Sequence, residues 1–497
     1  MPPDDKVARS KPIELRDPSL LKQKGCLDGN WIDADDGGSI DVVDPATGVT
    51  LGTTPWMGAA ETRRAIEAAN AAWPAWRAKT AKERAVILRR WSELMLANVD
   101  DLALILTSEQ GKPLAEAKGE ITIAAAYVEW FAEEARRVYG EVIPTIGNDR
   151  RLVVIKEPVG VCAAITPWNF PSSMITRKVS PAFAAGCTVV IKPAEATPYS
   201  AFALAELAQR AGFPPGVLNV ITGDARAIGG EMCANELVRK LSFTGSTEVG
   251  RLLMQQVAPT IKKISLELGG NAPFIVFDDA DLDAAADGAI VSKYRNAGQT
   301  CVCANRVFVH DKVYDAFAEK LIERVRKLKV GPGTEPGVTQ GPLINQDALD
   351  KVKDHVADAT SRGAKVALGG AGDARGGWFY QPTVLTGVTP EMKIFSEETF
   401  GPVAPLIRFH SDEEVIALAN KTESGLASYF YSRDIGRIWR VAEALEYGMV
   451  GVNTGLITTE VAPFGGMKQS GLGREGSKYG IEEFIEVKYI CMGGIER

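Results

Sequence analysis

Apolar residues recur at helical spacing through the first quarter of the chain. The stretches AAETRRAIEAANAAWPAW at 59–76 and AKERAVILRRWSELMLANVDDLALILTSEQ at 81–110 carry charged residues between their apolar positions. This pattern is typical of amphipathic helices. A short strand-like opening, GNWIDADDGGSIDVVDPATG at 29–48, precedes them. We therefore expect a helix-rich first segment.

From about residue 151 the pattern changes to short strand-like runs, the later ones separated by helical segments. The runs are RLVVIKEPVGVCAAITPW at 151–168, TVVIKP at 188–193, VLNVITG at 217–223 and VRKLSFTG at 238–245. A second alternating stretch extends from APFIVFDD at 272–279 to GMVGVNTG at 448–455, and GGNAP at 269–273 separates the two. Such alternation predicts two α/β lobes, the first with a parallel sheet wound with helices.

The closing run FIEVKYICMGG at 484–494 alternates like a strand, but no partner lies nearby in the sequence. We expect it to pair with a distant element or with another subunit, because an unpaired strand exposes its backbone groups.

Length and charge limit the classes of protein to consider. A chain of 497 residues is too long for one ordinary core, so two large lobes are expected. With 56 basic and 63 acidic residues the net charge is -7, which disfavours nucleic acid or an anionic membrane as the main partner. Apolar stretches such as 181–191 are too short to cross a bilayer. The start, MPPDDKVARSKPIELRD, has neither the apolar core of a secretory signal nor the acid-poor character of a transit peptide, so a cytoplasmic location is expected.

Two of the seven cysteines stand one residue apart in GQTCVCANR at 298–306. A structural zinc site is not expected, because there is no second cysteine pair and the chain has only three histidines. A cysteine hydrolase would need a histidine base. His310 ends the strand-like RVFVH, and His355 and His410 lie in charged stretches that are expected to be exposed. Three other cysteines are interpreted as small buried hydrophobes: Cys162, Cys187 and Cys233.

Four further positions carry chemistry. Glu267 lies between leucines on a strand-like run, where an acid is either paired or kept for proton transfer. Asn169 lies between two prolines in TPWNFP, where a fixed amide is able to donate to an oxyanion. Lys192 and Glu195 follow a strand, at the edge where α/β sheets bind nucleotides. GLGREG at 471–476 matches the dinucleotide fingerprint but lacks its strand and its βαβ unit, so a glycine-rich turn is the better interpretation.

Taken together, these segments resemble the aldehyde dehydrogenase superfamily over nearly the whole chain. The matching segments are TPWNFP, IKPAEATP, FTGSTEVG, LELGGNAP, GQTCVCANR, EETFGPVAP and PFGGMKQSGLGREG. Within the superfamily, MITRK, YRNAGQTCVCANR and EGSKYGIEEF resemble the succinate-semialdehyde dehydrogenases.

The resemblance implies an α/β fold with three parts. They are a Rossmann-type NAD(P)-binding domain at 1–139 and 159–268, an α/β catalytic domain at 269–477, and a β-strand oligomerisation arm at 140–158 and 478–497. Such an arm builds a homodimer or homotetramer and would supply the partner of the closing strand.

The resemblance also implies roles for three residues. Cys301 matches the nucleophile that attacks the aldehyde and passes through a thiohemiacetal and a thioester. The Asn169 side chain and the Cys301 backbone N–H would hold the oxyanion. Glu267 matches the base that activates water against the thioester. This base weakens the alternative of a CoA-acylating enzyme, which would pass the acyl group to a thiol.

Cofactor contacts carry over from the resemblance to Trp168, Lys192, Glu195, Gly245, Ser246, Leu268 and Glu398. A carboxylate such as Glu195 accepts hydrogen bonds from ribose hydroxyls but repels a 2'-phosphate. We therefore expect NAD to be preferred, with NADP tolerated through Lys192, and no metal.

Arg177 and Arg295 match the pair that grips the distal carboxylate of a small semialdehyde, and Thr459 matches the position of a hydroxyl on that carboxylate. Succinate semialdehyde is the expected substrate. Glutarate semialdehyde is the nearest alternative, because one methylene changes discrimination by only about 1 to 3 kcal/mol. Cys303 is interpreted either as a packing residue or as the redox partner of Cys301.

Overall fold

A computed structural model describes residues 13–495 of the chain. The expectation that the chain has no leader signal concerns mainly residues 1–12, which lie outside the described residues. Within the described residues, no helix is long and apolar enough to span a membrane.

An eight-stranded sheet forms the first lobe, with the order β2-β1-β9-β8-β7-β10-β11-β21. The five strands from β9 to β11 run parallel, as the alternation predicted, and β1, β2 and β21 add antiparallel edges. The strands are β1 (Gly25–Leu27), β2 (Asn30–Ile32), β7 (Val161–Ile165), β8 (Thr188–Lys192), β9 (Leu218–Val220), β10 (Val238–Thr244), β11 (Lys263–Glu267) and β21 (Gly471–Leu472).

Both faces of this sheet are buried. On β7, Cys162 and Ala164 belong to one core, whereas Val161 and Ala163 belong to the core on the other face. Continuous apolar runs are expected where helices cover a parallel sheet on both sides. The covering and flanking helices are α1 (Ala59–Ala78), α2 (Ala81–Ala97), α3 (Val99–Gln110), α4 (Leu114–Glu134), α5 (Ser173–Ala185), α6 (Pro198–Ala211), α7 (Ala225–Ala234) and α8 (Thr247–Val257).

The order of strands in this sheet reverses between β7 and β10. The chain moves outward from β7 through β8 to β9, then returns to place β10 and β11 on the other side of β7. In open α/β sheets, ligands bind beyond the carboxyl ends of the strands at such a reversal. The segments that follow β7 and β10 are therefore the place to look for a cofactor site.

A seven-stranded sheet forms the second lobe, with the order β14-β15-β16-β13-β12-β18-β19, and only β14 runs antiparallel to its neighbour. The strands are β12 (Ala272–Val276), β13 (Ala304–His310), β14 (Lys365–Leu368), β15 (Thr383–Thr386), β16 (Val403–Phe409), β18 (Ala427–Tyr431) and β19 (Met449–Val452). Its helices are α9 (Leu282–Tyr294), α10 (Tyr314–Val325), α11 (Gln346–Ser361), α12 (Lys393–Ser396), α13 (Asp412–Asn420) and α14 (Ile435–Ala444). Residues 268–271 connect β11 of the first sheet to β12 of this one, in agreement with the GGNAP junction.

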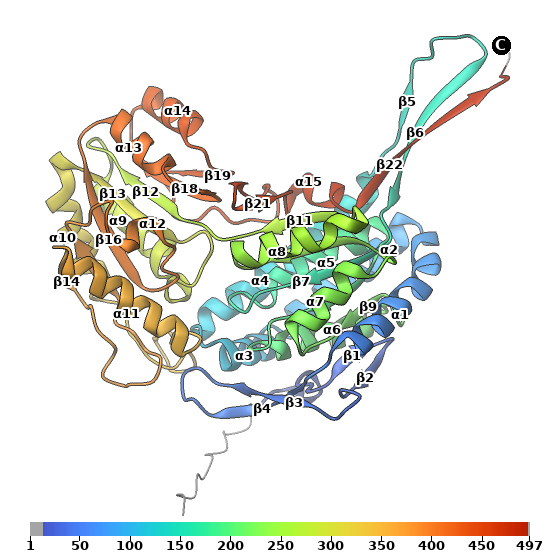
Figure 1. Cartoon of the computed structure of the whole chain (residues 1–497), viewed down its shortest axis with the longest axis horizontal. Coiled ribbons are helices and arrows are strands. Elements are labelled where there is room, and N and C mark those ends of the chain that lie inside the picture. The colour runs from blue at the N-terminus through green and yellow to red at the C-terminus, as the bar shows by residue number, and fades with distance from the viewer. Residues whose placement is uncertain (1–12, 496–497) are drawn as a thin grey trace, which may run out of the picture.

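The closing strand finds its partner far away in the sequence. β22 (Ile485–Gly493) pairs antiparallel with β6 (Arg150–Pro158) along its whole length, and β5 (Glu141–Ile143) pairs on the other side of β6. Figure 1 shows these three strands projecting as a long arm from the first lobe, on the side away from the second lobe.

Short elements complete the chain. They are the hairpin β3 (Ser39–Val43) with β4 (Thr50–Pro55), the pair β17 (Ser424–Gly425) with β20 (Met467–Lys468), helix α15 (Ser477–Glu482), and the 3-10 turns η1 (Pro18–Leu20), η2 (Ala135–Arg137), η3 (Ala258–Thr260), η4 (Arg295–Gly298) and η5 (Asp311–Val313).

Candidate active site

Cys301 lies in the loop that connects α9 to β13, and this loop has unusual backbone geometry. Asn296 and Ala297 adopt φ values of 52° and 53°, a left-handed conformation that is costly for residues with a Cβ. Gly298 follows at φ 76°, and a Cβ there would lie 2.2 Å from the carbonyl oxygen of Gly401. Only glycine fits this position, so the backbone of the loop is tightly constrained just before the cysteine.

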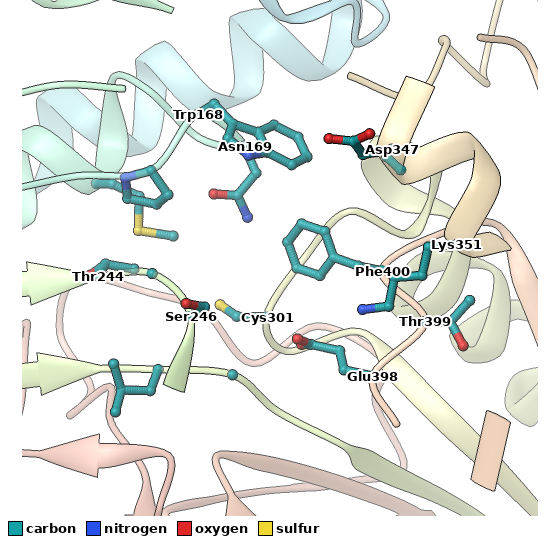
Figure 2. A pocket seen from close by; sticks show the side chains of 16 residues that line it. Trp168, Asn169, Thr244, Ser246, Cys301, Asp347, Lys351, Glu398, Thr399 and Phe400 are labelled. Carbon is teal, nitrogen blue, oxygen red and sulfur yellow. The ribbon is translucent and has the colours of Figure 1, made fainter. Parts of the chain in front are cut away.

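One cavity of about 340 Å³ lies where the strand order reverses. Trp168 and Asn169 follow β7, and Gly245 and Ser246 follow β10. Figure 2 shows the Asn169 carboxamide and the Cys301 sulfur reaching into this space, with Glu398 and Phe400 on the other side. Of the seven expected cofactor residues, five line the cavity: Trp168, Gly245, Ser246, Leu268 and Glu398.

The other two expected cofactor residues, Lys192 and Glu195, are not among the lining residues. Lys192 is buried at the end of β8, and its Nζ lies 2.5 Å from Glu195 Oε1. Both lie at the carboxyl edge of the same sheet, where Lys192 is the neighbour in register of Ile165 on β7.

A second cavity of about 330 Å³ begins on the other side of Cys301. Arg177 and Arg295 both line it, together with aromatic side chains such as Phe170 and Phe464. Cys301 and Met174 line both cavities. The thiol therefore lies where two cavities meet. One is the cavity beyond β7 and β10, here called the cofactor-side cavity, and the other is the arginine-lined cavity.

The thiol of Cys301 is protonated in the free protein. Burial raises its pKa to about 12, with Arg177 opposing that shift and Glu398 adding to it. A thiol is a poor nucleophile until it loses its proton. The thiol therefore has to lose its proton before it can attack an aldehyde.

Asn169 is buried, and its Nδ2 donates to the carbonyl oxygen of Gln299 at 3.1 Å. Gln299 belongs to the loop that carries Cys301, so this bond holds the amide beside the cysteine. The Oδ1 atom of Asn169 has no hydrogen-bond partner among the described residues.

Glu267 ends β11 and pairs in register with Thr244 of β10, which lines the cofactor-side cavity. Burial, and then the charge of Glu475, raises the pKa of Glu267 well above its usual range, while Lys178 and Arg177 lower it. Its Oε2 has no hydrogen-bond partner within the part of the chain that the structure describes. A buried acid with a raised pKa and a free oxygen suits a residue that exchanges protons.

Glu475 connects this acid to the arginine-lined cavity. It lies 2.5 Å from Lys178 Nζ and 2.9 Å from Arg177 Nε, and all three side chains are buried. Burial opposes its ionisation, but Lys178 and Arg177 outweigh this effect and lower the pKa of Glu475. The positive charge of Arg177 is therefore partly compensated inside the protein by Glu475, which it shares with Lys178.

Arg295 differs from Arg177 in this respect. Its guanidinium lies 5.3 Å from the centre of the Phe170 ring, and it forms no ion pair with any residue in 13–495. The carboxylate of Glu116, whose pKa is raised by burial and lowered by Lys112 and Arg295, lines the same cavity. A half-buried cation without an ion-pair partner is a natural anchor for a small anion.

Thr459 does not line the arginine-lined cavity; the preceding residue, Thr458, does. The Thr459 hydroxyl turns instead to Glu460, at 3.1 Å. Cys303 is buried, and its thiol donates to the carbonyl oxygen of Lys293 at 3.4 Å. Cys301 and Cys303 are both free thiols.

The expectation that His355 is exposed was wrong. It is 1% exposed, and its ring bonds to Thr399 and Glu397 at 3.2 Å each. The charged neighbours of His355 lie on the outer face of α11, whereas His355 shares the apolar stripe of Val352 and Ala359. His410 is exposed, as expected, and the last residue of β13, His310, is buried.

Sequence reasoning missed several residues of the site. Lys178 and Glu475 were quoted only as parts of longer motifs, and 297 positions separate them. Phe400 lies in EETFGPVAP and packs edge-on against Trp168, with ring centres 5.7 Å apart. A positive charge at 178 and an acid at 475 give no local signal of their pairing, because only the folded chain brings them together.

Comparison with known proteins agrees with this geometry. Residues 31–490 match the profile described as "Aldehyde dehydrogenase family".

The chain belongs to the aldehyde dehydrogenase family.

It is 64% identical over 483 residues to the glutarate-semialdehyde dehydrogenase of Pseudomonas aeruginosa, covering 97% of this chain and 100% of the relative. It is 63% identical over 481 residues to the NADP(+) succinate-semialdehyde dehydrogenase of Escherichia coli, with coverage of 97% and 100%. The crystal structure of succinate-semialdehyde dehydrogenase from Burkholderia pseudomallei matches with a TM-score of 0.96 and 67% identity, covering 96% of this chain and 99% of that one. The protein is thus an oxidoreductase with the aldehyde dehydrogenase fold.

Enzymes of this family use NAD(P), and the cofactor-side cavity fits such a group. Ser246 caps the N-terminus of α8, its Oγ accepting from the Val249 N–H at 3.3 Å, and a helix N-terminus attracts phosphate. A Cβ at Gly245 would lie 2.4 Å from the Phe243 ring, so no side chain is accommodated there. The buried Thr244 Oγ1 has no partner among the described residues and is available to a bound amide.

These properties predict how Cys301 reacts with iodoacetamide in the free enzyme. The thiolate fraction, and with it the labelling rate of Cys301, should rise about tenfold per pH unit between pH 7 and 9, because the pKa lies above this range. Peptide mass spectrometry measures the rate, with the buried Cys303 as the internal control that stays unlabelled. A rate that is already constant from pH 7 upward would contradict the protonated thiol.

Proposed function

We propose that this protein oxidises succinate semialdehyde to succinate with NAD(P). The observation that carries the proposal is the position of Cys301 at the meeting point of two cavities, one of which holds Arg177 and Arg295. An aldehyde carbon at the thiol with a carboxylate near the arginines describes a small semialdehyde. Relatives named succinate- and glutarate-semialdehyde dehydrogenase are nearly equally similar, so glutarate semialdehyde is the second candidate.

In the proposed reaction, the Cys301 thiol loses its proton to solvent, and the sulfur attacks the aldehyde carbon. The Asn169 amide and the Cys301 backbone N–H donate to the oxyanion of the thiohemiacetal. NAD(P), which Trp168, Ser246 and Glu398 would hold in the cofactor-side cavity, would supply the hydride acceptor that turns the thiohemiacetal into a thioester on Cys301. Glu267 then removes a proton from the water that hydrolyses the thioester, and succinate departs.

The proposed division of the chain follows the three largest sheets, except that the edge strand β21 of the first sheet falls within the catalytic segment. The NAD(P)-binding domain comprises 1–139 and 159–268, the catalytic domain 269–477, and the arm 140–158 and 478–497. The arm sheet exposes apolar side chains that include Val142 and Val487, 77% and 68% exposed. This exposure supports an arm that contacts a second copy in a homodimer or homotetramer.

Substrate selection should depend on Arg295. In the wild type, kcat/KM should be about 10- to 100-fold higher for succinate and glutarate semialdehydes than for butanal, because the two acids make charged hydrogen bonds. Replacing Arg295 by Met should remove most of this difference in kcat/KM. The kcat/KM of that variant for butanal should stay within about threefold of the wild-type value. Formation of NADH or NADPH measures each rate.

Arg295→Lys is the matched control, since it keeps the positive charge but loses the planar guanidinium. Its preference in kcat/KM for the two acids over butanal should lie between those of the wild type and the Met variant. Arg177 is less suitable for this test, because its removal also disturbs Glu475. If butanal is oxidised as well as the acids by the wild type, both arginines are structural and only the aldehyde dehydrogenase assignment remains.

For the cofactor we propose a preference for NAD. The carboxylate of Glu195 lies beside Lys192 at the carboxyl edge of β8, where it disfavours the 2'-phosphate of NADP. We expect kcat/KM for NAD to exceed that for NADP by about tenfold, and Glu195→Ser to narrow or reverse the ratio. A tenfold preference of the wild type for NADP, the cofactor named for the E. coli relative, would overturn this part.

Cys303 is proposed as the redox partner of Cys301. Two thiols and one hydrogen peroxide give a disulfide and two waters, and the bridge would block the nucleophile until a thiol reductant reopens it. A bridge across a single residue is strained and easily reduced. Cys303→Ala should therefore lose the part of peroxide inactivation that dithiothreitol reverses. An unchanged reversible loss in that variant would exclude the bridge.

A further inference from the structure

Three charged side chains that take no part in the proposed chemistry lie close to the active site, and two of them, Glu116 and Glu120, line the arginine-lined cavity. Lys112 lies two residues before the start of α4, and Glu116 and Glu120 belong to that helix. Glu116 and Glu120 are four residues apart and therefore share one face of α4. Lys112 and Glu120 are fully buried, with side-chain exposures of 0% and 1%, and their charged ends lie 2.6 Å apart.

The ammonium group of Lys112 contacts the oxyanion-binding residue directly. Its Nζ donates to the backbone carbonyl oxygen of Asn169 at 2.7 Å and lies 3.7 Å from the centre of the Phe170 ring. The side chain of Asn296 donates to the same carbonyl oxygen at 3.0 Å. The Asn169 backbone is thus held from two sides, one of which belongs to the cysteine loop.

Glu120 extends this contact to the segment after Asn169. Its Oε1 accepts from the backbone N–H groups of Ser172 and Ser173, at 2.9 Å and 3.2 Å. These residues begin α5, the helix that also carries Arg177. One carboxylate therefore pairs with Lys112 and fixes the start of the helix that leads into the substrate cavity.

Glu116 holds the opposite side of the site. Its Oε2 accepts from the backbone N–H of Asn296 at 2.8 Å, one of the two left-handed residues before Cys301. Left-handed residues persist only where the surroundings fix them. The Asn296 Nδ2 also donates to the Gln299 carbonyl oxygen, at 3.2 Å, as does the Asn169 side chain.

A role in stability alone explains this arrangement poorly. Buried ion pairs are weak contributors to stability, because removing two charges from water costs about as much as their attraction returns. The contacts of Lys112, Glu116 and Glu120 converge on the Asn169 segment and on the cysteine loop, the two parts whose separation decides where an oxyanion is held.

We infer that Lys112, Glu116 and Glu120 are positioning residues that set the Asn169 amide against the Cys301 loop for oxyanion stabilisation. The inference rests on the proposed function, since it assigns them to the same reaction. They touch neither the aldehyde carbon nor the sulfur, and they act through Asn169 and Asn296. Displacement of an oxyanion donor lowers the turnover rate and leaves ground-state binding of substrate nearly unchanged.

The double variant Lys112→Met/Glu120→Gln isolates the contact with Asn169. It removes both partners of the buried ion pair together, and the Gln amide oxygen still accepts from Ser172 and Ser173. Glu116, whose pKa both Lys112 and Arg295 lower against the effect of burial, keeps Arg295 as a neighbouring charge. We expect kcat with succinate semialdehyde to fall about 10- to 100-fold, with KM and the cofactor Kd within about threefold of wild type. The unfolding temperature and the rate of Cys301 alkylation, which needs no oxyanion site, should stay close to wild type.

Each result of this experiment is decisive. A kcat within about threefold of wild type in the folded variant overturns the inference. Parallel losses in kcat, alkylation rate and unfolding temperature also overturn it, because they indicate a structural role. The wild type, measured in parallel, tests the proposed function separately: if it oxidises no semialdehyde, the proposed function fails before the variants are compared.

A matched pair at Glu116 decides the question if the double variant does not fold. Glu116→Gln keeps an acceptor for the Asn296 N–H and should retain kcat within about threefold, whereas Glu116→Leu removes the acceptor and should lower kcat at least about tenfold. Equal kcat values for the Gln and Leu variants would contradict the inference.

Discussion

The active site depends on one constraint, the left-handed turn at Asn296 and Ala297. This turn lies between α9 and β13 and precedes Cys301 in the same loop. Asn296 and Ala297 each cost about 1–2 kcal/mol in this conformation. The turn persists because its backbone and side-chain groups bond to the segment after β7 and to α4. The same bonds that hold the strained turn also bring the cysteine of one lobe to the strand-order reversal of the other.

The charges of the site follow from this meeting of lobes. Glu475 offsets part of the charge of Arg177 and Lys178, and its own charge adds to the effect of burial that raises the pKa of Glu267. Arg295 forms no ion pair among the described residues and lines the same cavity as the Glu116 carboxylate. On the proposed function, a substrate carboxylate would enter a space where Arg177 is paired internally with Glu475 and Arg295 is available to it.

The sequence predicted much of the architecture because parallel sheets leave a strong local signal. The apolar runs at 188–193 and 238–245 are strands, and the fingerprint-like GLGREG begins with a two-residue edge strand, not a dinucleotide loop. The partner of the closing strand was not readable from periodicity, since β6 and β22 are separated by most of the chain. The resemblance to the family indicated it.

The site was predictable where a motif carries its own chemistry and less so where chemistry depends on distant pairing. Cys301, Asn169 and Arg295 line the two cavities, and Glu267 is buried beside Thr244, whereas their roles in the reaction stay predictions. The pairing of Lys178 with Glu475 and the burial of His355 depend on which face of a helix meets the core. Whether Thr458 or Thr459 lines the arginine-lined cavity depends on the path of a loop, and loops have no periodicity from which this could be predicted.

The central claim is that Cys301 carries a thioester that Glu267 helps to hydrolyse. The most direct measurement is mass spectrometry of the Cys301 peptide after mixing the Glu267→Gln variant with succinate semialdehyde and NAD and quenching in acid. The account predicts a succinyl group on Cys301, accompanied by a burst of NADH and little further turnover. Unmodified Cys301 in a variant that still turns over at the wild-type rate would contradict it.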